Sequence, residues 1–429
     1  MSADPAVLID AAAVEPAAPI GLHVLSPEAW AGFAAGGADI RFLGLFVARE
    51  RVHALFERAG TLLFLATPLV DGRYPALSPR WPLAAWFERL ARDLTGAIAD
   101  GAADTRPAIR HGAAGTDSGW PRFIETRGEG YHQIGQGPVS GLIASPVHRR
   151  FTLDGGRIVR LEHRLGYAHR GILALMRGKS PRAAARFAAR IAGGATVAHS
   201  LAFARATEAA SGVSAPPRAE ALRGIMLNIE RITSDCSALA GTAEAAGRAR
   251  LATALGRARE DIAAALAVGF GHRLMMDLVV PGGLAADVRP DGFPDLVSSL
   301  GSAARIARGI GRAGVQRDLG SAASLALARA RSAIALAAAA TDALAALPDG
   351  IIAHPLPMAS GMAIGVADSA AGPIQHWIML EAGQIAEAFV IDPAARLLPV
   401  LEAAAAGGDF DEFSLISQVY GLNIGAVDL

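Results

Sequence analysis

The densest group of side chains able to do chemistry lies in the stretch LEHRLGYAHR, residues 161–170. Histidine titrates near neutral pH, so this run could move protons or couple them to a conformational change. The same side chains could instead form a salt-bridged cluster that fixes the segment, because buried charges must be paired. Since structural networks also shift pKa values, we favour the structural interpretation and keep a relay as its rival. The residues concerned are Glu162, His163, Arg164, Tyr167, His169 and Arg170.

Metal and nucleophile chemistry find little support in the sequence. Cys236 is the only cysteine, so neither a disulfide nor a thiolate-rich metal site can form within the chain. No base stands near Cys236 in the sequence, so we expect a packing role for it. His163 and His169 are six positions apart, too far for the two histidines of a zinc-protease helix. The glycine-rich stretches at 281–283 and 309–314 lack the lysine or the preceding strand that a phosphate-binding loop needs.

The composition favours a folded protein that does not bind nucleic acid. Lysine plus arginine and aspartate plus glutamate both number 40, so the whole chain has no basic footprint. A hydrophobic fraction of 52% excludes disorder for most of the chain. Arg182, Arg186 and Arg190 recur at helical spacing, which we interpret as a solvated face unless an acidic partner docks there.

Neither a secretory signal nor a membrane span is predicted. Met1–Asp10 lacks a basic segment followed by an apolar run. The most membrane-like stretch, Ser332–Thr341, is bracketed by Arg331 and Asp342 and is far shorter than the roughly 20 residues that a bilayer requires. We therefore expect a soluble or peripheral protein in the cytoplasm.

Three regions with different patterns follow one another along the chain. Residues 1–20 are rich in alanine and proline and predict a flexible leader. Residues 21–125 predict a small α/β domain, with strands at Arg41–Arg49 and Thr61–Ala66 around a helix at Glu50–Ala59 and a polar linker from residue 101.

The third region, 126–429, begins with a β-hairpin around Asp154-Gly155-Gly156 and then becomes helical. Long helices with short breaks predict a bundle, at about 181–211, 217–247, 251–269, 292–312 and 320–346. Strands at 363–366, 374–380 and 385–391 and a helix at 394–405 follow. The fold class is therefore α+β: a mainly helical bundle core with a peripheral β-hairpin and C-terminal strands, preceded by the small α/β domain.

Six stretches in a fixed order carry a family resemblance. They are YPALSPRWPLAAWFERLARDL from Tyr74; Gly137-Pro138 with the hairpin and RLGYAHRGI from Arg164; RIAGGATVAHSLAFARATEAA from Arg190; IERITSDCSALAG from Ile229; FGHRLMMDLVVPGGLAADV from Phe270; and the closing IQHWIML, VIDPAARLLPVLEAA and FDEFSLI. Residues 74–429 thus resemble the large subunit of energy-converting nickel–iron hydrogenases and the related quinone-site subunit of complex I. The small domain resembles the smaller complex I subunit that is fused to, or partners, such large subunits.

The resemblance locates a metal site whose ligands are missing. In the family, nickel and iron are held by two thiolate pairs, one on the first bundle helix and one near the C-terminus. The matching positions on the helix are Ala192 and Ala195, while the C-terminal region offers Tyr420, Asn423 and Gly425. Alanine has no lone pair, so the resemblance implies a degenerate site without nickel or iron and leaves a cavity that water or neighbouring residues could occupy.

Other family side chains are replaced as well. An arginine of a P-R-G stretch aligns with Ala370-Ala371-Gly372, and the histidine and tyrosine of the quinone branch align with Ala144 and Phe187. His199 matches a histidine of the hydrogenase motif, although an isolated helix histidine is more often simply hydrogen-bonded. Arg190, next to the missing site, would need an acid, for which Glu230 and Asp235 are candidates, and His272, Arg273 and Asp277 offer similar pairing.

The resemblance implies a subunit of a hetero-oligomeric, membrane-associated oxidoreductase complex, peripheral on the cytoplasmic side of the inner membrane. It implies an iron–sulfur small subunit and antiporter-like membrane subunits as partners, with the iron–sulfur cluster in the partner and no cofactor in this chain. The candidate relay is Glu162, His163, His169, Arg170, Arg190, His199 and Asp235. Two alternatives remain: a structural coupling subunit without redox chemistry, and an independent soluble enzyme using His132, His148, His163, His169 or His199 for a metal.

Overall fold

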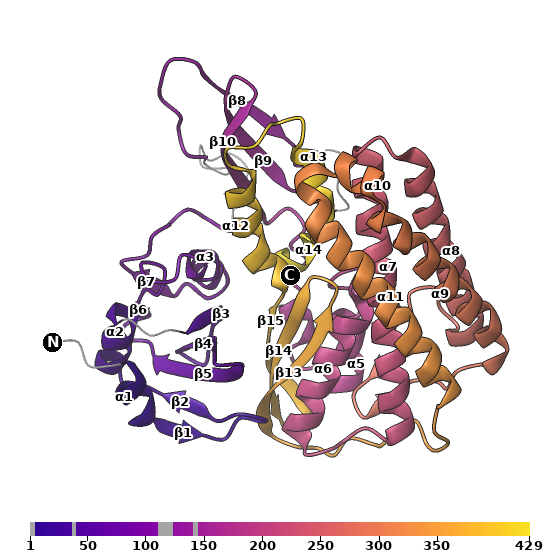
Figure 1. Cartoon of the computed structure of the whole chain (residues 1–429). Coiled ribbons are helices and arrows are strands. Elements are labelled where there is room, and N and C mark those ends of the chain that lie inside the picture. The colour runs from indigo at the N-terminus through magenta and orange to yellow at the C-terminus, as the bar shows by residue number, and fades with distance from the viewer. Residues whose placement is uncertain (1–4, 37–39, 110–122, 140–144) are drawn as a thin grey trace.

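The computed structural model describes residues 5–36, 40–109, 123–139 and 145–429. Helices and strands are mixed along the chain, which confirms the α+β class. Figure 1 shows an N-terminal sheet on one side, a helix bundle on the other, and a C-terminal sheet between them. A further small sheet stands above, beside the last helices.

The N-terminal sheet has five strands in the order β1-β2-β5-β4-β3, with only β2 and β5 parallel. Its strands are β1 (Ala13–Glu15), β2 (Leu22–Val24), β3 (Arg41–Ala48), β4 (Arg51–Arg58) and β5 (Thr61–Pro68). The helices α1 (Pro5–Asp10), α2 (Pro27–Ala35) and α3 (Ala84–Thr95) and the short pair β6 (Arg73–Pro75) and β7 (Ile98–Asp100) complete the unit. Residues 5–20, expected as a leader, form α1 and β1, and Ala18 bonds to β13 of the C-terminal sheet.

The helix predicted at Glu50–Ala59 is wrong, because this segment is strand β4. Arg49 and Glu50 both have positive φ, so they form a two-residue turn that places Ala48 opposite Arg51. The apolar run is continuous because both faces of the sheet are covered. Phe56 contacts Phe33 of α2, whereas Phe46 stacks on Phe389 of the C-terminal sheet.

The predicted β-hairpin is confirmed and belongs to a three-stranded sheet of order β10-β9-β8. Its strands are β8 (Tyr131–Gln136), β9 (His148–Asp154) and β10 (Arg157–Arg164), with Gly155 at positive φ in the turn. A small second core joins this sheet to the last helices. Phe151 of β9, for example, meets Phe410 and Phe413 edge-on.

The predicted bundle is present, with one difference in its first helix. Its helices are α5 (Pro181–Ala188), α6 (Thr196–Ser211), α7 (Pro217–Ala245), α8 (Ala249–Phe270), α9 (Phe293–Ala307) and α11 (Ala323–Ala345). The segment predicted as one helix over 181–211 forms two helices, because a turn that contains Gly193-Gly194 interrupts the helix between α5 and α6. Short elements link them: α4 (Ile172–Met176), α10 (Ala313–Asp318), the strands β11 (Val279–Val280) and β12 (Gly283–Leu284), and three 3₁₀ turns, η1 (Pro290–Gly292), η2 (Arg308–Gly311) and η3 (Gly320–Ala322).

Helix α11 with the preceding turn, Gly320–Ala345, is long and apolar enough to cross a membrane by length and composition, which the sequence analysis did not predict. About a third of its most apolar window is buried in the fold. It packs against α7 and α9, and its Arg329 forms an ion pair with Asp235 of α7. A packed bundle helix passes the same test, so this helix is weak evidence for a membrane span.

The C-terminal sheet is antiparallel, with β13 (Gly361–Ser369), β14 (Gly372–Glu381) and β15 (Gln384–Ile391) in that order. Helices α12 (Pro393–Ala405), α13 (Phe413–Tyr420) and α14 (Gly425–Asp428) follow. Strand β13 lies closely against α6, whose buried residues include the i, i+4 series Ala198, Ala202 and Ala206. These small side chains let strand and helix approach, which fixes the β13–β14 turn beside the start of α6.

Candidate functional site

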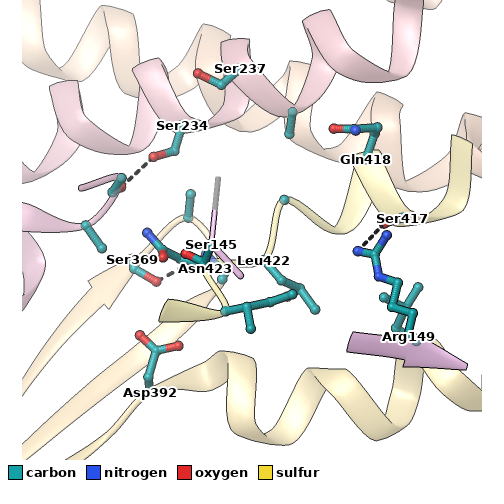
Figure 2. Close-up of a pocket in the computed structure, with 18 residues that line it drawn as sticks. Ser145, Arg149, Ser234, Ser237, Ser369, Asp392, Ser417, Gln418, Leu422 and Asn423 are labelled. Carbon is teal, nitrogen blue, oxygen red and sulfur yellow. Dashed lines mark hydrogen bonds between the residues drawn. The ribbon is translucent and has the colours of Figure 1, made fainter. Parts of the chain in front are cut away.

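A cavity of about 310 Å³ lies where five distant segments meet. They are the loop before β9, the break between α5 and α6, helix α7, the β13–β14 turn, and the region from α12 to the C-terminal end (Figure 2). Its polar lining residues are Ser145, Arg149, Ser234, Ser237, Ser369, Asp392, Ser417, Gln418 and Asn423. A volume of roughly 300 Å³ with a few polar groups is the lower end of the range for small-molecule sites.

The cavity includes several of the positions that the family resemblance singled out. Ala195 and Asn423 line it, as do Ala370 and Ala371 at the P-R-G position. Ala192 is buried immediately before the turn between α5 and α6. Gly425 packs closely against the hydroxyl of Ser145, which lines the cavity. The fold therefore brings together the segments that the resemblance implies.

The residues of this cavity do not fit a nickel–iron centre. The polar side chains that line it carry hydroxyls, two amides, one carboxylate and one guanidinium. Nickel and iron of this kind instead require soft thiolate ligands. Cys236 is fully buried in α7 outside the lining, and burial raises the pKa of its thiol to about 12. Within the described ranges, no three histidine, cysteine or acidic side chains are grouped to hold a metal ion.

Two buried histidines lie behind one wall of the cavity. Asp392 caps α12 by accepting a hydrogen bond from the Ala394 N–H, at 2.7 Å. Its Oδ2 lies 3.3 Å from Nε2 of His199, although the two groups are not aligned as a hydrogen bond. Nδ1 of His199 is 3.1 Å from Nε2 of His376 on β14. A line of three titratable groups thus runs inward from the cavity.

Acid is expected to destabilise the protein through His376. Burial, and next the neighbouring His199, hold the pKa of His376 well below 6.5, so the folded state keeps this ring neutral. The unfolded chain takes up a proton below about pH 6.5 that the folded state refuses. Stability from this group is therefore complete above that pH and falls by up to about 1.4 kcal/mol per pH unit below it.

The variant His376→Asn tests this expectation by urea unfolding at about pH 7.5 and about pH 5.5, on either side of the unfolded-state pKa. It should lose less stability than the wild-type protein on acidification, because its side chain cannot titrate. His354→Asn, at an exposed histidine, serves as the control and should follow the wild type. Equal acid sensitivity of wild type and His376→Asn would contradict the assignment.

None of the predicted relay residues lines the cavity, and they do not form one cluster. Glu162 pairs with Arg164 at 2.8 Å and with Arg106 at 3.4 Å. His163 meets Glu402 of α12, whose Oε1 lies 3.0 Å from Nδ1 and 2.8 Å from the backbone nitrogen of His163. These contacts attach strand β10 to its surroundings, which favours the structural interpretation of this part of the run.

His169 and Arg170 hold the C-terminal segment. Nδ1 of His169 is 2.6 Å from the carbonyl oxygen of Asp428, and Arg170 donates to the carbonyls of Arg190 and Ile191 at 2.7 and 2.8 Å. The buried Asp428 carboxylate in turn accepts the backbone N–H groups of Gly166 and Ala168. These bonds join the C-terminal segment, the run after the hairpin and the end of α5.

Arg190 does not pair with the candidate acids Glu230 and Asp235, and its partner comes from the other group named for pairing. Its guanidinium forms a two-pronged ion pair with Asp277, at 2.5 and 2.7 Å, on the protein surface. Glu230 instead accepts the N–H groups of Val197 and Ala198 at the start of α6, at 2.5 and 2.9 Å, and burial raises its pKa to about 8. Asp235 pairs with Arg329. Both predicted acids therefore serve helix contacts rather than Arg190.

The two quinone-branch positions differ in what the structure describes. Phe187 is half-buried on α5, with the Lys179 ammonium 5.7 Å from its ring centre. It is apolar and is not among the lining residues of the cavity. Ala144 lies outside the described residues.

Sequence reasoning missed Arg149, Asp392 and His376. A signal existed for the first, because strand alternation puts Arg149 on the same inner face as Phe151. Asp392 directly precedes a proline that starts a helix, which is a typical N-cap pattern. His376 is the only ionisable residue in IQHWIML, but its contact with His199 joins segments 177 positions apart.

Comparisons with known proteins agree with this geometry. Residues 170–236 match the nickel-dependent hydrogenase family. Formate hydrogenlyase subunit 5 of Escherichia coli is 31% identical over 183 residues, which are 38% of this chain and 32% of that protein. An NADH-quinone oxidoreductase subunit of Saccharopolyspora erythraea is 31% identical over 177 residues, 41% of this chain and 39% of that one. The matched region thus spans about a third of the length of these curated relatives.

A solved structure extends the likeness to most of the fold. A chain of the membrane-bound sulfane sulfur reductase, an archaeal respiratory membrane complex, superposes with a TM-score of 0.62 at 14% identity, covering 70% of this chain and 99% of that one. The resemblance predicted from the sequence is confirmed: the chain carries the large-subunit fold of nickel-dependent hydrogenases and is homologous to formate hydrogenlyase subunit 5 and to the NADH-quinone oxidoreductase relative.

Proposed function

We propose that this chain is a subunit of a membrane-associated complex related to energy-converting hydrogenases and complex I, in which its own cavity does not hold a nickel–iron centre. The carrying observation is the cavity at the meeting of the family segments, lined by Ala195 and Asn423 where thiolates would be needed. The relatives are named as hydrogenase and quinone oxidoreductase subunits, and the fold matches a chain of a membrane complex.

The proposed role is to couple redox or conformational change to membrane ion-translocating subunits. The partners that we propose are an iron–sulfur small subunit, which carries the cluster, and antiporter-like membrane subunits, with this chain peripheral on the cytoplasmic side. We also keep the division into a small domain over 21–125 and a hydrogenase-like domain over 126–429. Among the proposed relay residues, His199 lies with its Nε2 3.3 Å from the carboxylate of Asp392, which lines the cavity, so it is the relay position to test first.

Purification of the intact complex from native membranes, followed by mass spectrometry and metal analysis, tests this proposal. The chain should copurify with an iron–sulfur subunit and antiporter-like subunits, and the complex should contain iron without stoichiometric nickel. Stoichiometric nickel would overturn the degenerate-site assignment. A chain that purifies alone, with no iron–sulfur partner, would overturn the complex-based function.

A structural coupling subunit without redox chemistry is the second candidate. It is favoured by contacts that bind separate segments together, made by Glu162 with Arg106 and by His163, His169 and Arg170. Quinone-dependent turnover distinguishes the two. If the intact complex reduces a quinone and His199→Phe impairs that turnover while the complex stays assembled, the structural candidate is excluded.

A further inference from the structure

Arg149 on strand β9 is an exception among the buried arginines of the described chain. Five arginines are almost fully buried, and four of them have a carboxylate partner. Arg89 pairs with Asp104, Arg164 with Glu162, Arg223 with Glu208 and Arg329 with Asp235. Arg149 is only 5% exposed, yet it forms no ion pair with a carboxylate in the described ranges.

The contacts that Arg149 does make leave its charge uncompensated. Its Nη2 donates to the Ser417 hydroxyl at 3.3 Å, and its guanidinium lies 5.4 Å from the centre of the Phe413 ring. Its Nε has no hydrogen-bond partner in the described structure. Burial lowers its pKa to about 10, so the group stays positive at neutral pH. A buried cation in this state is costly unless an anion reaches it.

The space beside Arg149 is the cavity itself, and other donors there are free. Figure 2 shows Arg149 at one side of the cavity, joined to Ser417. The side chains of Ser145, Gln418 and Asn423 also line it and make no hydrogen bond to the described residues. Asp411 lines an adjoining pocket that Arg149 shares but forms no ion pair with the arginine. These side chains therefore have hydrogen-bonding groups available to a ligand, and the cavity that they line is large enough for a small molecule.

We propose that this cavity binds a small anion that presents two oxygens side by side, a carboxylate or a tetrahedral oxyanion, to the Arg149 guanidinium and the Ser417 hydroxyl. The planar fork of an arginine matches such an oxygen pair. Asp392 lies on the opposite side of the cavity in Figure 2 and would repel a second negative group. The ligand therefore carries its charge at one end and neutral hydrogen-bonding groups at the other. This site stands whether or not the chain assembles as proposed above.

Calorimetric titration and thermal unfolding of the full chain, with the subunits that it retains, test the site. The probes are sodium acetate and sodium sulfate, with sodium chloride at equal ionic strength as the reference. At least one of the two oxyanions should bind and raise the unfolding midpoint beyond the effect of chloride. In Arg149→Met this affinity should fall at least about tenfold, because the charged fork is lost. In chloride alone the same variant should unfold at an equal or higher temperature than the wild type, because an uncompensated buried charge has been removed.

Arg150→Met is the matched control, since Arg150 is the next residue on the same strand and points to the other face, over the Phe123 ring. It should keep the full response to the oxyanion. Arg149→Lys preserves the charge but not the planar fork. This variant should fold, and it should bind the oxyanion more weakly than the wild type does. The proposal fails if acetate and sulfate act no differently from chloride on the wild-type protein, or if Arg149→Met and Arg150→Met respond alike.

Discussion

Replacing Arg329 with methionine is expected to lower the free energy of unfolding of the full chain by about 3–5 kcal/mol. The Arg329 side chain of α11 is 9% exposed and pairs with the almost fully buried Asp235 of α7 at 2.6 Å. It also donates to the carbonyls of Val419 and Tyr420, both at 2.6 Å, which end helix α13. Methionine fills similar space but leaves the buried Asp235 carboxylate without its paired cation, with the Ser332 hydroxyl still beside it, and leaves two helix-end carbonyls without their donor.

Equilibrium unfolding in urea measures this loss. Arg331→Met, two positions along the same helix and exposed, should stay within about 0.5 kcal/mol of the wild type. The double variant Arg329→Met with Asp235→Leu should recover part of the loss, because it removes the stranded charge as well. A loss below about 1 kcal/mol for Arg329→Met, within the range of surface pairs, would show that the pair does not join these helices.

The Arg329 contacts bear on the cavity as well as on stability. The guanidinium lies under Gly421, which lines the cavity directly after α13. Arg170 joins the C-terminal region to the end of α5 in the same way, because its Nη2 donates to the carbonyls of Ile191 and Gly425. Side chain to backbone bonds thus hold two walls of the cavity.

The bundle helices and most of the strands could be predicted from the sequence. Pro181 and Pro217 start α5 and α7, and long alanine-rich segments between such signals carry little ambiguity. The error at Glu50–Ala59 arose because strand β4 is covered on both faces, so its apolar residues do not alternate with polar ones. Two positive-φ residues without glycine, Arg49 and Glu50, concealed the turn before it.

Two positions that the resemblance singled out, Ala195 and Asn423, lie on one cavity, whereas its charged side chains were not predicted. This neighbourhood could be predicted because a family resemblance implies which distant segments meet, whereas local sequence patterns do not. Ion-pair partners could not be predicted, since Arg190 could meet any acid that the bundle brings near. Its actual partner, Asp277, lies 87 positions away, whereas the expected Glu230 is used at the start of α6. Which charges remain unpaired, as at Arg149, is likewise decided only by packing.

The close approach of β13 to α6 leads to the second large effect, in the variant Gly365→Ala. A Cβ on Gly365 would come closer than 3.0 Å to the Ala202 carbonyl and the Ala206 nitrogen, both backbone atoms of α6. Neither can rotate away, so strand and helix must separate, and the loss should reach about 3 kcal/mol, the upper end for overpacked cores. Urea unfolding measures it, with Gly301→Ala as control.

Gly301 lies exposed on α9 with no atom within 4 Å of an added Cβ, so alanine there should leave stability unchanged or raise it by about 0.5–1 kcal/mol. The Gly365 variant should affect the site as well, because β13 leads directly into the turn containing Ser369, Ala370 and Ala371 on the cavity wall. Displacement of that strand should weaken acetate or sulfate binding even at temperatures where the chain stays folded. An unaltered stability for Gly365→Ala would mean that β13 does not pack on α6. The position of the turn at Ser369–Ala371, and so the geometry of the cavity, would then be wrong.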